Sequence, residues 1–543
     1  MSHKLDALFV GFESQENLGL RYIMAYLARL GFSSQLVPLD PSSPMAVVDV
    51  ARRTEPLLIG FSIIFQYTIE DFRDVLRLLR GHGVRGHLTA GGHFPTLRPG
   101  ETFAELPELD SVVRFEGEAT TAELMSRLRD AGDWHQIPGL AFRNGDDIAL
   151  NPPRPLVADL DELPWPVRGE PAVMRGIPAA SMLASRGCCF DCAFCSIRQF
   201  YGGAPGALRR SRSPQDVVAE MLHLHDSARV RLFVFHDDDF AAKTSAQRRW
   251  MDSFLDGLRN TGLDRRIAWK ISCRVDDVDA GILARAKAHG LNSVYVGVES
   301  GHAEGLAALN KRTTVEQNLS ALRTMKDLGL SYDMGFMLID PSSTLEGLRK
   351  NVRFLRQVAE LGGVPISFAK TMPLAGTPLE QQLRESRRLT GTATRPDYDL
   401  LDPRADHLAL FLTLHFSFRN SSPRGLVERL RAAAFDHALA RSFESGAWIE
   451  AYGKTLAVLV DRCNAAALDA LDRLLDVVTE LPPVADSVPR VWADLTRIME
   501  PAHQTEALLN AELKALLSRY SPALASAFER EDEQEPEDGY VYC

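Results

Sequence analysis

The chain has 543 residues, 45% of them hydrophobic and 24% charged, and a net charge of −11. This length exceeds what one hydrophobic core holds, so we expect several domains of ordinary globular composition. We also expect a cytoplasmic protein with neither a membrane nor nucleic acid as a partner. No apolar run reaches the roughly twenty residues that cross a bilayer, the charged start Met1–Asp6 is untypical of a secretory signal, and negative charge disfavours a large nucleic-acid footprint.

Residues 1–145 alternate strand and helix signals. Apolar runs predict strands at Ala7–Phe12, Leu57–Ser62, Leu88–Ala90 and Val112–Phe115. Helical apolar spacing predicts helices at Gly19–Leu30 and Ile69–Arg80. The last two strands run into glycine-containing turns. The fold class predicted here is α/β, a doubly wound parallel sheet with ligands beyond the carboxyl ends of its strands.

The rest of the chain divides into four segments. Residues 146–177 are rich in proline and predict an extended linker. Residues 178–400 resume the alternation at a longer period and predict a partial (β/α)6 TIM-like barrel. Its strands are expected at Ala180–Ser185, Arg231–His236, Ala268–Cys273, Ser293–Val298, Tyr332–Leu338 and Val364–Ala369. Residues 401–528 predict an α-helical domain, and the acidic residues 529–543 predict a disordered tail.

Four of the seven cysteines lie within eight residues, in the run R-G-C-C-F-D-C-A-F-C directly after the first predicted barrel strand. The thiolates of Cys188, Cys192 and Cys195 have the spacing C-x3-C-x2-C. Three thiolates on one loop can bind three irons of a [4Fe–4S] cluster and leave the fourth iron open. An open iron can chelate the amino and carboxylate groups of S-adenosylmethionine (SAM), so the radical chemistry would come from the cofactors.

Two other kinds of metal site compete with this interpretation of the cysteine loop. A zinc site would need a fourth ligand such as His223 or His225. A ferredoxin-like C-x2-C-x2-C motif would use Cys189 in place of Cys188, but such motifs continue into a further C-x3-C-P. No cysteine occurs between Cys195 and Cys273. The spacing therefore favours the open cluster.

Polar residues follow several predicted barrel strands, where functional groups of such barrels gather. One of them, Asp340, either faces a substrate or caps the helix that begins near Leu345. Asp340 and Lys370 are the weak catalytic candidates, and no stronger one is identified. The full set at the strand ends is Asp237, Asp238, Arg274, Glu299, Ser300, Asp340 and Lys370.

The cysteine loop resembles the signature loop of the radical SAM superfamily, and the likeness extends over about residues 178–400. The resemblance implies that Phe194 contacts the adenine of SAM. It also implies that Asp237 or Asp238 and Glu299, with Ser300, hold the SAM amino and ribose groups, and that Arg274 binds its carboxylate. Cys189 departs mildly from the family pattern, as does Ile339-Asp340-Pro341 where many relatives have Gly-x-Pro-Gly.

The first 145 residues resemble the cobalamin-binding domain that precedes many radical SAM barrels; an empty scaffold is the alternative. The residues that the resemblance assigns to cobalamin are Asn17, Gly19, Gln66, Gly91, Gly92, His93, Glu116, Gly117 and Glu118. The D-x-H-x-x-G motif is missing, since Glu16 stands at the histidine position. We therefore expect cobalamin without a protein histidine as lower ligand, with Phe65, Gln66 or Tyr67 near that face and His93 structural.

Together the resemblances imply a cobalamin-dependent radical SAM enzyme, most simply a C-methyltransferase that acts at an unactivated carbon through a 5′-deoxyadenosyl radical. The cofactors expected are a [4Fe–4S] cluster, SAM and cobalamin, and the partners are a small-molecule or peptide substrate and an external electron donor such as flavodoxin or ferredoxin. A cobalamin-assisted cyclase or oxidative rearrangement enzyme is the alternative within the family. A non-catalytic cobalamin or metal sensor is the alternative of another class.

Overall fold

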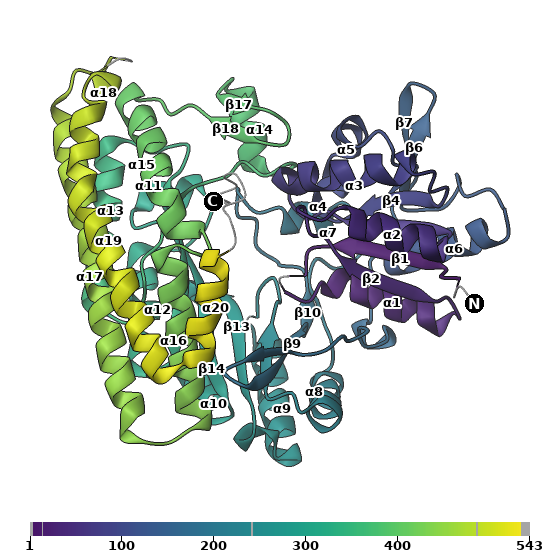
Figure 1. Ribbon diagram of the computed structural model, residues 1–543, viewed down its shortest axis with the longest axis horizontal. Coiled ribbons are helices and arrows are strands. Elements are labelled where there is room, and N and C mark those ends of the chain that lie inside the picture. Colours follow the sequence, from purple (N-terminus) through teal and green to yellow (C-terminus); the bar gives the residue numbers. More distant parts are fainter. Residues whose placement is uncertain (1–3, 14, 241–242, 485–486, 534–543) are drawn as a thin grey trace. The chain divides into compact units, whose positions relative to one another are not determined.

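The computed structural model describes residues 4–13, 15–240, 243–484 and 487–533 (Figure 1). The chain forms two compact units. The first comprises Met1–Pro171, Ala180–Glu220 and Pro373–Asp397, and the second comprises Ala172–Ala179, Met221–Met372 and Tyr398–Cys543. These units cut across the expected boundaries at residues 178 and 400, because the cysteine loop and residues 373–397 group with the N-terminal sheet.

The first unit contains the expected doubly wound sheet, with the strand order β2-β1-β3-β4-β5-β6-β7. Its five parallel strands are β1 (Ala7–Gly11), β2 (Ser34–Pro38), β3 (Leu58–Ser62), β4 (His87–Gly91) and β5 (Ser111–Val113). Strands β6 (Leu140–Asn144) and β7 (Asp147–Leu150) add an antiparallel hairpin at one edge. The sequence prediction omitted β2 and the hairpin.

Helices cover both faces of this sheet because its strands bury alternate side chains on opposite sides. Phe61 packs with Phe72 in one apolar cluster, whereas Phe9 packs with Leu27 and Leu124 in the other. The helices of this part are α1 (Leu18–Arg29), α2 (Met45–Thr54), η1 (Gln66–Thr68), α3 (Ile69–Gly81), α4 (His93–Leu97), α5 (Pro99–Glu105) and α6 (Glu118–Arg129).

The predicted linker holds some regular structure, namely β7 and the turn η2 (Leu160–Glu162). The cysteine loop follows within the first unit, between β10 (Ser185–Arg186) and α7 (Ile197–Gly202). Strand β10 pairs antiparallel with β11 (Arg210–Ser211). The segment Pro373–Asp397 of the first unit contributes α14 (Pro378–Glu385), β17 (Leu389–Gly391) and the start of β18 (Pro396–Tyr398).

The barrel sheet has the order β16-β15-β14-β13-β12-β9-β8. Strands β12 (Leu232–Phe235), β13 (Ala268–Arg274), β14 (Leu291–Glu299), β15 (Ser331–Ile339) and β16 (Ala369–Lys370) pair in parallel. β9 (Ile177–Met182) neighbours β12, and β8 (Ala172–Met174) pairs antiparallel with β9. The partial barrel is confirmed, although β16 is shorter than the expected Val364–Ala369.

Helices alternate with these strands as the sequence predicted. They are α8 (Pro214–Ala228), α9 (Ser245–Thr261), η3 (Leu263–Arg265), η4 (Val275–Asp277), α10 (Ala280–Ala288), α11 (Ala303–Ala308), α12 (Val315–Asp327) and α13 (Leu345–Leu361). Thr244 and Thr314 close capping boxes at the starts of α9 and α12. The indole of Trp269 on β13 packs edge-on against Phe254 of α9 and Phe235 of β12, which fixes the helix-facing side of the sheet.

The C-terminal region is helical, as expected. It comprises α15 (Pro403–Ser421), α16 (Leu426–Phe443), α17 (Ala447–Glu480), α18 (Ser487–Arg490), α19 (Trp492–Tyr520) and α20 (Pro522–Glu533). The long helix α17 runs beside α19 (Figure 1). Helix α15 was not predicted.

The expected disorder from residue 529 is wrong for Glu529–Glu533, which lie within α20. The guanidinium of Arg429 pairs with Asp532 and lies over the ring of Phe528, so α20 is held by both charge and apolar contact. The rest of the predicted tail, including Cys543, lies outside the described residues.

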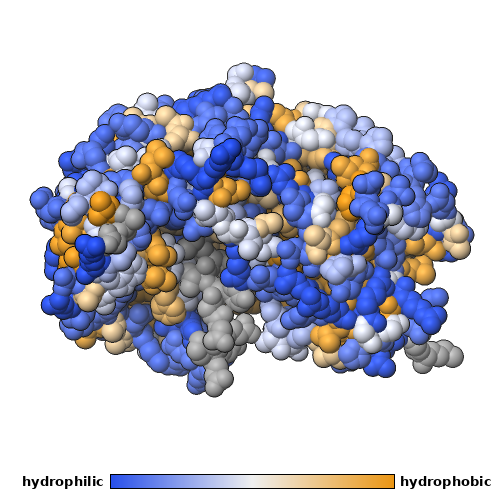
Figure 2. Space-filling view, turned by 90° about the horizontal axis from the view of Figure 1, so that it is seen from above, coloured by the Kyte–Doolittle hydropathy of each residue, from blue (hydrophilic) through white to orange (hydrophobic). Residues whose placement is uncertain are grey.

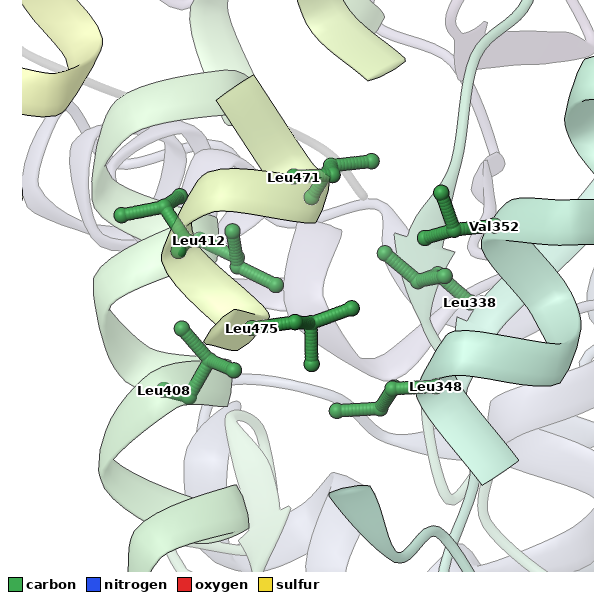
Figure 3. Close-up of a pocket in the computed structure, with 8 residues that line it drawn as sticks. Leu338, Leu348, Val352, Leu408, Leu412, Leu471 and Leu475 are labelled. Carbon is green, nitrogen blue, oxygen red and sulfur yellow. The ribbon is translucent and has the colours of Figure 1, made fainter. Parts of the chain in front are cut away.

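Leucine side chains join the helical region to the barrel. Figure 3 shows residues of α13, α15, α17 and β15 pointing toward one another: Leu338, Leu348, Val352, Leu408, Leu412, Leu471 and Leu475. Helix α16 lies against the barrel strands, where Asn292 donates to the Ala438 carbonyl at 2.9 Å.

On the face shown in Figure 2, hydrophilic residues predominate and hydrophobic ones are scattered in small groups. Among the described residues, no helix combines the length and hydropathy that a membrane span needs.

Candidate functional site

The cysteine loop begins with a turn that requires glycine. Gly187 has φ +85°, and a Cβ there would overlap the carbonyl oxygen of Leu208. Arg186, the residue before it, is paired with Arg210 in the β10–β11 ladder. The loop also has internal support, because the Cys195 amide donates to the Cys192 carbonyl at 3.2 Å.

The three predicted cluster ligands share one environment. Cys188, Cys192 and Cys195 are reduced thiols of intermediate exposure, whereas Cys189 is exposed and its carbonyl accepts from Arg198 at 3.2 Å. Three thiolates on one loop are a suitable donor set for a [4Fe–4S] cluster, which bonds each sulfur to a separate iron.

The zinc alternative needs a fourth ligand, for which the sequence offers His223 and His225. His225, a proposed fourth zinc ligand, instead lies with Nδ1 2.8 Å from the Val230 carbonyl. The open cluster therefore remains the better interpretation.

The carboxylate of Glu299 lies at the end of β14, as expected. Its Oε1 accepts from Lys311 Nζ at 2.8 Å, and both side chains are buried. The backbone of Glu299 has φ +68° at an irregularity in the β14–β15 register. Such strain in a non-glycine residue is typical of functional sites, since it costs about 1–3 kcal/mol and must be offset by the surroundings.

The neighbouring SAM candidates are held to different degrees. Arg274 is buried and donates through Nε to Asp276 at 2.9 Å and through Nη2 to the Lys311 carbonyl. Asp237 is buried, whereas Asp238 is exposed, so Asp237 is the better of the two for a site inside the barrel mouth.

Ser300 is held by the polar side chains of two helices. Its hydroxyl is fully buried and lies 3.2 Å from Asn351 Oδ1, on helix α13. Its carbonyl accepts from Asn318 at 2.9 Å. The assignment of Ser300 to SAM stays a prediction.

The two weak catalytic candidates are engaged within the protein. Asp340 is fully buried and its Oδ1 accepts from the Ser342 amide at 2.8 Å, so it forms a turn rather than facing a substrate. The cap of the following helix is Thr344. Lys370 donates to the Tyr398 carbonyl at 2.9 Å and lies over the Tyr398 ring.

A polar row inside the barrel was missed by the sequence analysis. Ser272, Tyr295 and Asp333 are register partners on β13, β14 and β15. Tyr295 is 37% exposed, and burial of its hydroxyl raises its pKa. The sequence did contain a signal for this row. Buried parallel strands are usually apolar on both faces, whereas polar and apolar residues alternate along these three strands. Arg431 of α16 closes one end of the row through Asp333 at 3.0 Å.

Several residues expected to bind cobalamin instead bind protein. Glu116 and Glu118 form buried ion pairs with Arg186, at 3.1 and 2.7 Å, and Glu116 also pairs with Arg210 at 3.0 Å. Gln66 is buried and its Oε1 accepts from the Ala375 amide at 2.7 Å. Because buried polar groups need partners, these contacts are part of the folded structure. The assignment of the three side chains to cobalamin stays a prediction.

The remaining cobalamin candidates have structural roles as well. Asn17 caps α1 by accepting from the Leu20 amide at 3.2 Å, and Gly19 lies in the first turn of this helix. Gly92 has φ +111°, and a Cβ there would overlap the Ile63 carbonyl oxygen, so this turn serves the packing of β3 against β4. Gly91 precedes it in β4, and Gly117 starts α6.

His93 is structural, in line with the sequence interpretation. Its Nδ1 lies 3.1 Å from Ser196 Oγ, and its ring stacks on Phe200 at 4.4 Å. Burial lowers the pKa of His93 to about 4, so the imidazole is neutral at physiological pH.

The carboxyl end of β3 presents a flat apolar surface. Ile64 is 45% exposed and Phe65 37% exposed, and the Phe65 ring stacks on the half-buried Tyr67 at 5.3 Å with an interplanar angle of 7°. Stacked rings that are partly exposed at a strand end suit a large planar ligand such as a corrin. These residues therefore fit cobalamin better than the buried Gln66 between them does.

The N-terminal sheet region and the barrel region each match a known protein family. Residues 12–125 match the family model of the B12 binding domain, and residues 182–355 match that of the radical SAM superfamily. The solved structure of the cobalamin-dependent SAM radical enzyme OxsB superposes with a TM-score of 0.68 at 17% identity, covering 97% of this chain and 83% of that one. The domains imply a [4Fe–4S] cluster, SAM and cobalamin.

Curated relatives are similar over part of their length. An uncharacterized methyltransferase of Pyrococcus horikoshii is 28% identical over 58% of this chain and 66% of its own length. The anaerobic magnesium-protoporphyrin IX monomethyl ester cyclase of Cereibacter sphaeroides is 28% identical, over 54% and 48%. The hopanoid C-3 methylase of Methylococcus capsulatus is 25% identical, over 71% of each. The chain thus spans about half to two thirds of the first two.

We predict that alanine at Cys188, Cys192 or Cys195 prevents cluster incorporation, whereas Cys189→Ala does not. Only the first three thiols have the spacing and the shared half-buried environment. Iron and sulfide content and visible absorption after anaerobic reconstitution measure this. An empty site in Cys189→Ala beside a filled one in Cys188→Ala would contradict the assignment.

We predict that Glu299→Gln keeps the cluster but weakens SAM binding. A charge-assisted hydrogen bond contributes on the order of 1.5–3 kcal/mol, which corresponds to about a ten- to hundred-fold change in dissociation constant. Anaerobic SAM titration of the reduced enzyme, followed by electron paramagnetic resonance (EPR), measures it. Glu304→Gln, which changes an exposed carboxylate on α11, the helix after β14, is the control. Wild-type affinity in Glu299→Gln removes the residue from the site.

Proposed function

We propose that this chain, a radical SAM enzyme with an N-terminal B12-binding domain, is a cobalamin-dependent C-methyltransferase acting at an unactivated carbon. One observation carries the proposal: the open-cluster loop Cys188–Cys195 folds in the same compact unit as the B12-binding sheet. When bound, the cluster supplies the electron that cleaves SAM to a 5′-deoxyadenosyl radical, and cobalamin carries the methyl group.

The side chains of the protein bind and orient in this proposal. Three thiolates hold the cluster, and the fixed carboxylate of Glu299 orients SAM at the end of β14. The stacked Phe65–Tyr67 pair would support the corrin. His93 would not serve as a cobalt ligand, because Ser196 and Phe200 hold its ring. Tyr295 and the other members of the polar row face the substrate inside the barrel. Two electrons per methylation come from an external low-potential donor of the flavodoxin or ferredoxin class.

Two observations support methyl transfer over the alternatives. Two relatives are named as a methyltransferase and a methylase, and the methylase is similar over 71% of its length. The relative named as a cyclase keeps ring closure or rearrangement as the second candidate. A purely sensory protein would not need a strained carboxylate and a polar row inside the barrel.

We predict that the anaerobic enzyme, given SAM and a strong reductant, forms both S-adenosylhomocysteine and 5′-deoxyadenosine. A methyltransferase uses one SAM as methyl donor and a second as radical source, so about one S-adenosylhomocysteine should form per bound cobalamin even without substrate. Chromatography of the two products measures this. Cys192→Ala should lose the 5′-deoxyadenosine, and Cys189→Ala should keep both.

The outcomes separate the candidates. 5′-Deoxyadenosine without S-adenosylhomocysteine would exclude methyl transfer and favour the cyclase. Neither product from a cluster-loaded enzyme would exclude both radical reactions and leave the sensor.

A further inference from the structure

Three turns of the B12-binding sheet contact the cysteine loop or its support, and all three lie within the first compact unit. They follow β3, β4 and β5, which are neighbours in the sheet. Each turn supports a different part of the loop. The side chains that make these contacts are Gln66, His93 and Glu116, which the sequence analysis had assigned to cobalamin binding.

The start of the loop is held by charge. Arg186 lies two residues before Cys188, and its buried guanidinium pairs with Glu116 and Glu118. Arg210, opposite Arg186 in the ladder, donates to both oxygens of Glu116 at 3.0 Å. Burial alone would raise the pKa of Glu116, but the two arginines hold it below its ordinary value, so the carboxylate is ionised.

The same carboxylate also orients the linker. Glu116 Oε2 accepts from the amide of Val157 at 2.7 Å. One carboxylate therefore joins the β5–α6 turn, the linker and both strands of the β10–β11 ladder. Both bonds from Arg210 come from the single nitrogen Nη1, whereas Arg186 uses one nitrogen for Glu116 and the other for Glu118.

The end of the loop is held by a neutral contact. Ser196 follows Cys195 directly, and its hydroxyl lies 3.1 Å from His93 Nδ1. The His93 ring stacks on Phe200 of α7, the helix that leaves the loop. His93 is therefore fixed by two contacts, both with the segment after the third cysteine.

The middle of the loop is reached through the segment after residue 373. Gln66 accepts from the Ala375 amide at 2.7 Å, and the Leu379 amide donates to the Ala193 carbonyl at 2.9 Å. Arg98 strengthens this route by pairing with Glu380 at 2.5 Å. Ala193 lies between the second and third cysteines.

We propose that Glu116 and His93 are positioning residues for the [4Fe–4S] cluster, holding the two ends of the cysteine loop so that its three thiolates keep the spacing of three irons. They act through Arg186 and Ser196 and need no contact with cobalamin. The inference rests on the cluster assignment and is independent of methyl transfer.

The test compares Glu116→Gln and His93→Phe in the full chain, reconstituted anaerobically with iron, sulfide and cobalamin. Each change keeps the shape of the side chain while removing the charge or the ring nitrogen. Outer partners of metal ligands typically change metal affinity by about ten- to a hundred-fold. We expect cluster retention against a ferrous chelator to fall by that factor, and the EPR spectrum of the reduced cluster to change, while cobalamin content stays at the wild-type level.

Matched controls lie in the same unit. Glu123→Gln removes a carboxylate of α6 that pairs with Arg154. His87→Phe removes a buried histidine whose Nε2 lies 2.7 Å from Ser111 Oγ. This is also a histidine–serine contact, but it does not involve the cysteine loop. Both controls should keep wild-type cluster retention and EPR spectrum.

Two further variants test the proposal if Glu116→Gln or His93→Phe does not fold. Ser196→Ala breaks the His93 contact from the loop side with the loss of one hydroxyl, and should reproduce the His93→Phe spectrum. Arg210→Met added to Glu116→Gln restores the charge balance and should recover part of the cluster retention. Wild-type retention and EPR in Ser196→Ala and Glu116→Gln would overturn the proposal, as would loss of cobalamin with an unchanged cluster.

Discussion

The carboxylate of Glu116 is the interaction on which the first unit depends. It is buried, and it pairs with Arg186 and Arg210 while accepting from the Val157 amide. Removing one partner of a buried ion pair typically costs about 3–5 kcal/mol, because the other charge is left without compensation. Removal of Glu116 would leave Arg186 with Glu118 and would take away the carboxylate that pairs with Arg210. The sheet, the linker and the β10–β11 ladder consequently fold as one unit. The position of the cysteine loop therefore depends on a domain that precedes it in sequence.

The barrel shows the same principle at another place. Glu299 is buried in a strained conformation, and Lys311 supplies the compensating charge. The glycines beside it, Gly297 and Gly335, leave room for this pair: a side chain at either position would meet the Glu299 carboxylate. A buried, paired and strained carboxylate is already fixed before a ligand arrives. It therefore loses little freedom on binding, which favours affinity for a charged cofactor.

The sequence predicted the parts that depend on local patterns. Strand–helix alternation and the C-x3-C-x2-C spacing both act over a few residues. The alternation is confirmed in the fold, whereas the cluster ligands inferred from the spacing stay a prediction. The side-chain roles of Glu116, Gln66 and Ser300 were not predictable in this way. The partners of these side chains lie 41 to 309 residues away. A glutamate in a glycine turn has the same local signature whether it contacts a ligand or an arginine. Only the fold distinguishes the two.

The long-range partners also explain why the compact units differ from the sequence domains. A sequence boundary follows the order of elements, whereas a compact unit follows the charges and apolar groups that must be buried together. Arg186 and Ser196 flank the cysteines and find their partners in the β5–α6 and β4–α4 turns rather than on nearby residues. Any ligand that orders those turns will therefore also restrict the loop, because the same side chains belong to both. The B12-binding sheet and the cluster loop are in this sense one element of structure, although the chain encodes them about seventy residues apart.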